Sequence, residues 1–325
     1  MNYFNSCPHL QGTNGVWDIL VKGAALVGGL KRLEDAKVKF LGYGGSSAGA
    51  IVAALKAVGY SAPEIREEMD RKPFIDFLDG FKHDINWKKL IEEFPELKLK
   101  NSINVLRYMW KHHILSIIKT IVISKGLYDG NDFSRWLKGL IEKKGPKDTA
   151  GHVTFGSLDR CADKIDIRIV AADLQNRSYV VLSKDGYADL ELYKAVRASM
   201  SIPLLFKPFP YTDNNYFVDG GVVSNFPAWI FQDEADKTVL GLRLESDTFK
   251  EINSFGSFGS ALFNTIFEGA NEIQNIGLDK NIHSIKINTQ DYSMLDFRLS
   301  TKDKTQLYNA GLAAVNDYFS GDIAQ

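Results

Sequence analysis

The hydrophobic and polar positions follow two periods along the chain, and these periods predict strands and helices in alternation. Short apolar runs predict strands at Val16–Val21, Val38–Tyr43, Ile165–Leu174, Ser178–Ser183, Tyr216–Val218, Thr238–Leu244 and Ile282–Asn288. Apolar residues at helical spacing predict helices at Ala24–Glu34, Ala48–Val58, Gly126–Lys143, Leu190–Met200, Phe258–Ile276 and Lys302–Phe319, with further helices after Ser61 and from Pro227 to Ala235. Because strands that alternate with helices form βαβ units, we expect an α/β protein with a mainly parallel sheet and helices on its faces.

Two of the predicted helices begin with capping signals. Ser61 is followed three residues later by Glu64, which predicts a capping box. Asp132 stands immediately before an apolar run that begins at Phe133, and we predict that it caps the helix there.

The stretch from residue 38 to residue 60 joins a predicted strand directly to a predicted helix. Its corner reads Gly45, Ser46, Ser47, Ala48, Gly49, which fits the Gly-x-Ser-x-Gly pattern of a nucleophile elbow. Glycines two residues before and after the serine let the two backbones approach without a Cβ clash. We therefore predict that Ser47 stands in a strained turn with its hydroxyl exposed. The amides that follow it open a helix and favour an oxyanion beside the serine.

Composition sets limits on the class of protein. The chain has 325 residues, of which 45% are hydrophobic and 24% charged, and its formal net charge is -1. A large core is therefore possible, whereas no overall field attracts nucleic acid or an acidic membrane, so that lipid binding must be local. The sequence contains no linker, low-complexity tract or repeat, which predicts one domain over residues 1–325.

Cysteine usage and the N-terminal residues suggest a location. Cys7 and Cys161 are isolated and lack metal-ligand spacing, which is typical of free thiols in a reducing compartment. The first fifteen residues contain neither a charged n-region nor an apolar h-region. We expect a cytoplasmic protein, although secretion by a route without a signal would leave no mark here.

The most hydrophobic part of the chain is Ile103–Ile123, within an apolar, cap-like helical insertion predicted at about residues 80–125. Charged residues and histidines interrupt it, so no uninterrupted apolar run reaches the length of a membrane span. One interpretation is a buried helix or helix pair. The other is a cap over the active site that makes peripheral contact with a bilayer, with Tyr108 and Trp110 at the headgroup level.

A serine hydroxyl needs a base, and the sequence offers two candidates. Asp219 ends a predicted strand and is followed by Gly220 and Gly221, which permit close backbone approach, so its carboxylate could reach the serine directly. An ordinary Asp-Gly turn is the alternative interpretation of this motif. His283 is the other candidate, because among the six histidines it alone follows Asp219, as a Ser, Asp and His hydrolase requires.

Four blocks in this order resemble the patatin-like phospholipases, and the similarity extends over nearly the whole chain. They are Gly45–Gly49, Ala195–Pro208, Asp219–Pro227 and Met294–Ser300. The resemblance implies a three-layer α/β/α fold and a dyad without histidine, with Ser47 as nucleophile and Asp219 as base. It also implies a phospholipase A or lysophospholipase type of lipid acyl hydrolase, which cleaves phospholipids or acylglycerols through an acyl-serine, without a metal or other cofactor.

One departure from the family concerns the glycine-rich oxyanion loop between the first strand and the first helix. Here that place reads Val21, Lys22, Gly23. Either Asp18–Leu20 replaces the glycines, or about five residues are missing. We favour the missing loop, because the predicted strand and helix on either side look intact; Gly23 would then supply a remaining amide. A lipid-binding protein with weakened or lost catalysis is therefore the alternative function, while the sequence leaves the oligomeric state open.

Overall fold

The computed structural model describes residues 13–17, 22–79, 124–161, 164–232, 237–245, 281–289, 292 and 297–322, together with residues 261, 262, 265, 266 and 269. The predicted cap at 80–125, including Ile103–Ile123, lies almost wholly outside the described residues. Most of the helix predicted at Phe258–Ile276 lies outside them as well.

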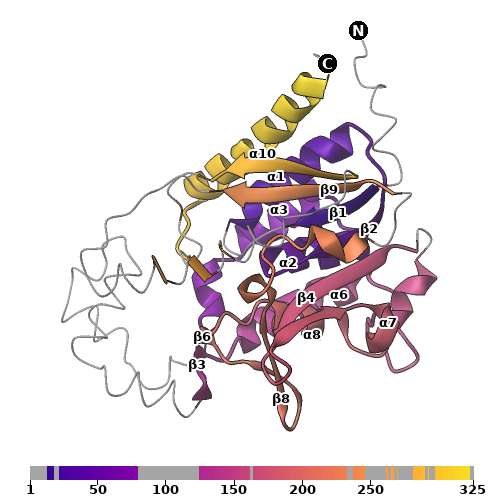
Figure 1. Cartoon of the computed structure of the whole chain (residues 1–325), viewed down its shortest axis with the longest axis vertical. Coiled ribbons are helices and arrows are strands. Elements are labelled where there is room, and N and C mark those ends of the chain that lie inside the picture. The colour runs from indigo at the N-terminus through magenta and orange to yellow at the C-terminus, as the bar shows by residue number, and fades with distance from the viewer. Residues whose placement is uncertain are drawn as a thin grey trace, which may run out of the picture.

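The core of the fold is a mostly parallel sheet (Figure 1). Its strands are β1 (Thr13–Trp17), β2 (Phe40–Gly45), β4 (Asp166–Asp173), β5 (Ser178–Leu182), β7 (Phe209–Thr212), β8 (Asn215–Asp219), β9 (Val239–Glu245) and β10 (Ile282–Asn288). Parallel pairing joins β10, β9, β1, β2 and β4 in that spatial order, and antiparallel pairing adds β5, β8 and β7. The predicted α/β class with a mainly parallel sheet is confirmed.

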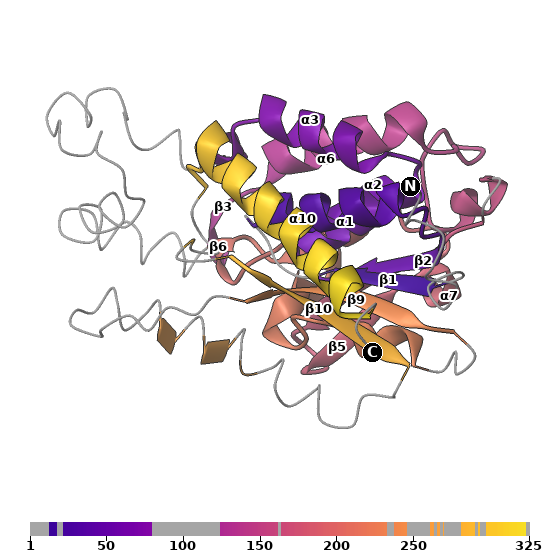
Figure 2. The same cartoon turned by 90° about the horizontal axis from the view of Figure 1, so that it is seen from above.

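Helices pack against this sheet. Those of the described residues include α1 (Gly23–Asp35), α2 (Ala48–Ala57), α3 (Ala62–Arg71), α6 (Asn131–Lys144), α7 (Lys184–Tyr187), α8 (Leu192–Ser199) and α10 (Thr301–Asp322). Figure 2 shows α1, α2, α3 and α6 on the same side of the sheet. The capping box predicted at Ser61 and Glu64 is confirmed at the start of α3.

Two glycines set the close contact between α1 and α10. A Cβ on Gly28 would lie 1.9 Å from the carbonyl oxygen of Tyr308, and a Cβ on Gly311 would lie 1.9 Å from that of Ala25. Gly28 weakens the helical pattern of the sequence, but its missing side chain lets the two helices touch backbone to backbone.

The opposite face of the sheet carries a smaller apolar cluster, built around the 3₁₀ turn η7 (Ala228–Phe231). Phe226, Ile230 and Phe231 are buried in it. A Cβ on Gly241 of β9 would lie 2.0 Å from the Phe226 ring, so this glycine makes room for the cluster. The helix predicted from Pro227 to Ala235 is therefore wrong over its described part, where the single short 3₁₀ turn Ala228–Phe231 takes its place.

The first strand also differs from its prediction. The apolar run suggested Val16–Val21, whereas β1 spans Thr13–Trp17 and pairs Trp17 with Gly45 of β2 and with Leu242 of β9. The strand therefore includes residues that precede the apolar run. Residues 18–21, the remainder of the predicted strand, lie outside the described residues, so the missing loop stays a prediction.

The start of α6 shows a third difference. A short strand, β3 (Gly126–Tyr128), precedes it and pairs in parallel with β6 (Leu204–Phe206). The N-cap is Gly130, with φ of +71°, and not Asp132. The carboxylate of the distant residue Asp79 accepts hydrogen bonds from the N–H groups of Gly130 (2.5 Å) and Asp132 (2.9 Å). A side chain 51 positions away therefore caps this helix.

Candidate active site

Ser47 lies between the end of β2 and the start of α2, as the elbow prediction requires. Its backbone has φ of 53° and ψ of -121°, a conformation that costs a non-glycine residue roughly 1–3 kcal/mol. A Cβ on Gly45 would lie 2.6 Å from the carbonyl carbon of Gly49, so the crossing of strand and helix needs a glycine there. The strained strand-turn-helix geometry predicted from Gly45–Gly49 is confirmed.

The surroundings of this turn are closed. Ser46 and Ser47 are both 0% exposed, and Ala48 is buried beside them. Ser46 Oγ donates a 3.1 Å hydrogen bond to the carbonyl oxygen of Asn225. The prediction that the Ser47 hydroxyl is exposed is therefore wrong, because the end of β8 and the residues that follow it pack over the elbow.

Asp219 is the last residue of β8, and its side chain points at the elbow. Its Oδ2 accepts a 2.7 Å hydrogen bond from Ser47 Oγ, and its Oδ1 accepts a 2.8 Å bond from the Gly221 N–H. A Cβ on Gly220 would lie 2.1 Å from the carbonyl oxygen of Val170, which explains the glycine after the aspartate. The structure thus joins Ser47 and Asp219 directly.

Burial sets the electrostatics of this pair. Asp219 is fully buried, and burial raises the pKa of its carboxyl from 3.8 to about 7. The hydrogen bonds from Ser47 and Gly221 act in the opposite direction, because they stabilise the carboxylate. A carboxyl group with a pKa near neutrality can both accept and return a proton, which suits a general base.

His283 lies away from this pair. It is in β10, where it pairs with Leu240 near the start of β9, and its Nδ1 lies 3.2 Å from the hydroxyl of Tyr318. Strands β9 and β1 separate β10 from β2 in the sheet. This geometry gives no support to a Ser, Asp and His hydrolase that uses His283.

The N-termini of two helices meet at the elbow. Gly23 opens α1, and a Cβ built on it would lie 3.6 Å from the Cβ of Ala48, which opens α2. The first N–H groups of a helix have no acceptor within the helix, and they carry its positive dipole end. Gly23, Ala48 and Gly49, the residues predicted to supply oxyanion donors, lie at these two helix starts, Gly23 in α1 and the other two in α2.

Sequence reasoning missed the polar residues that hold these elements in place. Lys22 is 5% exposed, and its Nζ donates a 2.8 Å hydrogen bond to Thr289 Oγ1, which ties the start of α1 to the end of β10. Arg197, Ser199 and Ser201 lie near the end of α8 and are buried, and the two serines contact the backbone of the Ser47–Asp219 pair. In the sequence, Arg197, Ser199 and Ser201 are visible only as polar positions inside an otherwise apolar block. This pattern does not indicate which groups they contact.

A cluster of metal-ligating types occurs elsewhere among the described residues. Glu142, His152 and Glu191 bring ligand atoms within 4.8 Å of one another. Lys194 Nζ lies 2.6 Å from Glu191, and Lys138 Nζ lies 3.6 Å from both glutamates. Since lysines already balance these carboxylates, we assign no metal to the cluster.

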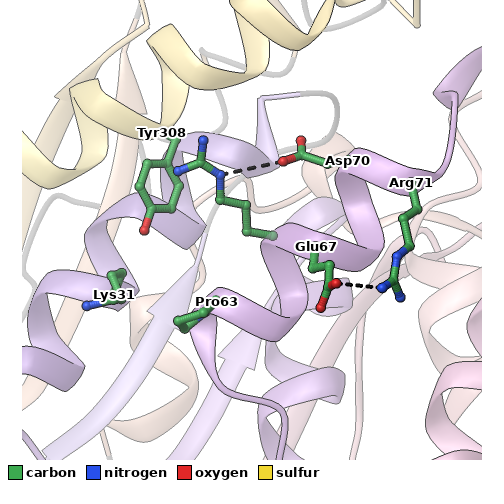
Figure 3. Close-up of a pocket in the computed structure, with 7 residues that line it drawn as sticks. Lys31, Pro63, Glu67, Asp70, Arg71 and Tyr308 are labelled. Carbon is green, nitrogen blue, oxygen red and sulfur yellow. Dashed lines mark hydrogen bonds and ion pairs between the residues drawn. The ribbon is translucent and has the colours of Figure 1, made fainter.

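A surface pocket lies between α1, α3 and α10 (Figure 3). It is lined by Lys31, Pro63, Arg66, Glu67, Asp70, Arg71 and Tyr308. Its charges pair within the same surface, as in the Arg66–Asp70 contact, and the Arg66 guanidinium lies 4.0 Å from the centre of the Tyr308 ring. The pocket contains neither Ser47 nor Asp219, so we separate it from the candidate active site.

The helices of the described residues include none with both the length and the apolar character needed to cross a bilayer.

Comparisons with known proteins find a family model, curated relatives and solved structures that are similar to this chain. A family model described as patatin-like phospholipase matches residues 20–232, which include Ser47 and Asp219. The chain is 31% identical over 308 residues to the uncharacterized protein YqhO of Bacillus subtilis (strain 168), covering 90% of this chain and 92% of that protein. It is 25% identical over 213 residues to the probable lipid hydrolase 463L of Invertebrate iridescent virus 6, covering 64% and 58%. Its fold resembles the crystal structure of VipD from Legionella pneumophila, with a TM-score of 0.59, 16% identity and coverage of 96% and 67%.

Proposed function

Because the chain belongs to the patatin-like phospholipase family, we propose that it is a lipid acyl hydrolase that uses Ser47 as nucleophile and Asp219 as base. The observation that carries this proposal is the 2.7 Å hydrogen bond from Ser47 Oγ to Asp219 Oδ2 at a strained strand-to-helix turn. The substrates we propose are phospholipids and acylglycerols, cleaved at a carboxylic ester.

The first half-reaction forms an acyl-enzyme. Asp219 Oδ2 takes the proton of the Ser47 hydroxyl while Ser47 Oγ bonds to the carbonyl carbon of the ester. The carbonyl π electrons move to oxygen and give a tetrahedral oxyanion. When this intermediate collapses, the bond to the glycerol oxygen breaks, and the leaving oxygen receives the proton from Asp219.

The second half-reaction restores the enzyme. Asp219 takes a proton from water, whose oxygen attacks the acyl carbon. Collapse of the second oxyanion breaks the bond to Ser47 Oγ, which recovers a proton from Asp219, and the fatty acid leaves. A pKa of about 7 lets the same carboxyl group accept and donate at neutral pH.

The amides that open α1 and α2 are the proposed oxyanion donors. Gly23 and Ala48 are neighbours at these helix starts, and removal of one such donor typically costs 10² to 10³ in turnover. A lipid-binding protein with weakened or lost catalysis is the alternative, and the helix starts at Gly23 and Ala48 are the observation that favours hydrolysis over it.

We further propose that residues 103–123 make peripheral contact with a lipid surface from the cytoplasmic side. The support is the sequence alone, namely the apolar run with Tyr108 and Trp110.

The decisive experiment combines active-site labelling with product analysis. A fluorophosphonate probe should label the wild type and not Ser47→Ala. Mixed phospholipid and acylglycerol vesicles should release fatty acid with the wild type only, and Asp219→Asn should fail in both assays. Labelling or fatty-acid release that persists in Ser47→Ala would exclude this nucleophile, and vesicle binding without release would support the lipid-binding alternative.

A further inference from the structure

The end of α8 touches both members of the Ser47–Asp219 pair. Ser199 Oγ accepts a 2.9 Å hydrogen bond from the Ser47 N–H, and the carbonyl oxygen of Ser201 accepts a 3.0 Å bond from the Asp219 N–H. Both serines are 0% exposed. Since only Met200 separates them, one short piece of backbone links the elbow to the end of β8.

A third hydrogen bond fixes the orientation of the Ser199 hydroxyl. Its Oγ donates a 2.6 Å bond to the carbonyl oxygen of Val170 in β4. In the sheet, β4 lies between β2, which leads into Ser47, and β8, which ends at Asp219. Because the hydroxyl proton is committed to Val170, a lone pair of the Ser199 oxygen faces the Ser47 N–H.

Arg197 holds the Ser201 side of this segment. Its guanidinium donates to Ser201 Oγ, to the carbonyl oxygen of Asp129 (2.7 Å) and to that of Lys207 (3.1 Å). These acceptors belong to three separate pieces of chain, and the planar guanidinium fixes their relative positions. A Cβ on Gly130 would lie 2.6 Å from Arg197 Nε, so the packing around the guanidinium is tight.

We propose that Ser199 is a positioning residue, which holds Ser47 in its strained turn at hydrogen-bond distance from Asp219, and that Ser201, anchored by Arg197, fixes Asp219 from the same segment. A strained conformation such as that of Ser47 persists only where its surroundings impose it. The bond from the Ser47 N–H to Ser199 Oγ is one such constraint.

Loss of the Ser199 hydroxyl should lower kcat and raise the pKa of Asp219. The effect on kcat rests on the proposed function. The Ser47 N–H and the Val170 carbonyl lose their partner, the turn relaxes, and Ser47 Oγ moves away from Asp219 Oδ2. Misalignment on this scale lowers kcat by about 10- to 100-fold, with KM within about twofold of the wild type. The pKa of Asp219 also rises further, because the hydrogen bond from Ser47 is one of the contacts that lower it.

The chain offers a matched control for this substitution. Ser157 is 3% exposed, and its Oγ likewise accepts a bond from a backbone N–H and donates one to a backbone carbonyl, both of Thr154, each at 2.9 Å. Ser157→Ala therefore removes the same kind of buried hydrogen bonds outside the candidate active site. It should lower stability much as Ser199→Ala does, without the kinetic and titration effects.

The test compares wild type, Ser199→Ala and Ser157→Ala by kcat, KM and the Asp219 carboxyl titration, followed by ¹³C NMR and assigned with Asp219→Asn. We expect a lower kcat and a higher Asp219 pKa in Ser199→Ala only. Equal kcat values and equal titrations in the two alanine variants would overturn the inference. If Ser199→Ala does not fold, Ser199→Cys, with a weaker acceptor of similar size, should give the same effects in smaller measure; a wild-type kcat and titration in Ser199→Cys would then overturn it.

The two proposals fail separately. A wild type that hydrolyses no lipid ester contradicts the proposed function, whereas the Asp219 titration still decides whether Ser199 positions the pair. A wild type that is active, with identical titrations and rates in Ser199→Ala and Ser157→Ala, contradicts the positioning role alone.

Discussion

Ser47 and Asp219 are 172 positions apart in the sequence, yet Ser47 Oγ donates a 2.7 Å hydrogen bond directly to Asp219 Oδ2. Both side chains are 0% exposed, so the bond forms away from water. The contact joins the end of β2, which runs parallel to β4, to the end of β8, which runs antiparallel to β4. A proton can therefore pass from the hydroxyl to the carboxylate without a third residue.

The pH dependence of hydrolysis should follow the Asp219 carboxyl. Only the ionised form can accept the Ser47 proton, and its pKa is about 7. We expect kcat/KM on a soluble ester to fall roughly tenfold per pH unit below 7 and to level off above it. Asp173→Asn is the control, because Asp173 is another buried carboxyl but its pKa is lowered. This substitution should leave the midpoint of the pH profile of kcat/KM unchanged. A profile that is flat from pH 5 to 8 would contradict Asp219 as the base.

The same pKa predicts how stability changes with pH. The folded-state pKa of Asp219 lies above the unfolded value of 3.8, so the folded protein binds the extra proton between these values. The resulting stabilisation is fully present below pH 3.8 and is lost as pH rises through 7, with an upper limit of roughly 4 kcal/mol. Asp219→Asn has no such proton. The free energy of unfolding of Asp219→Asn minus that of the wild type should therefore increase from pH 5 to pH 8 in denaturant titrations. A difference that stays constant would show that the pKa of Asp219 is not raised.

A glycine-to-alanine pair tests the geometry of the elbow. Gly45→Ala places a Cβ 2.6 Å from backbone carbon of Gly49, and since backbone cannot give way easily, we expect a loss of roughly 1–3 kcal/mol and of activity. Gly139→Ala, in the middle of α6 with no atom within 4 Å of the new Cβ, should instead gain about 0.5–1 kcal/mol and keep full activity. Thermal or denaturant unfolding measures both, and equal stability of the two variants would contradict the close approach of strand and helix.

The lipid-surface proposal leads to a separate prediction for Trp110. An indole at the headgroup level binds the interface, so Trp110→Ser should weaken sedimentation with phospholipid vesicles and lower hydrolysis of vesicle lipid by several-fold. Hydrolysis of a short, water-soluble ester should stay within about twofold of the wild type. Equal losses on both substrates would instead indicate a buried side chain that stabilises the protein.

The sequence was sufficient where the physical requirement is local. Glycines flanking Ser47 and following Asp219 are needed for backbone approach within a few residues, and this pattern is visible along the chain. The alternation of strands and helices gave the parallel sheet for the same reason. The Asp-Gly-Gly pattern made Asp219 a candidate partner of Ser47, but the choice between this role and an ordinary Asp-Gly turn rested on the family resemblance, because no local pattern says which carboxylate meets which hydroxyl.

The sequence was insufficient where partners come from distant segments. Ser199 and Arg197 owe their roles to backbone groups of Ser47 and Asp129, which side-chain patterns do not reveal. Likewise, Asn14 and Gly15 belong to β1 because they pair with β2 and β9, although they precede the apolar run of the sequence. Exposure of Ser47 was mispredicted because burial depends on the segment after β8, which packs over the elbow.

The cap of α6 provides a test of this distinction between local and distant partners. The local pattern assigns the cap to Asp132, whereas the carboxylate of Asp79 accepts the bonds from the Gly130 and Asp132 N–H groups. Asp79 is 7% exposed, so Asp79→Ala leaves these amides buried without their acceptor and should cost about 1–3 kcal/mol of stability. The Asp132 carboxylate pairs with Arg135 at the surface, and Asp132→Ala should change stability by less than about 1 kcal/mol. The denaturant midpoints of the two variants decide between the caps. If Asp132→Ala were less stable than Asp79→Ala, Asp132 and not Asp79 would be the residue that caps α6.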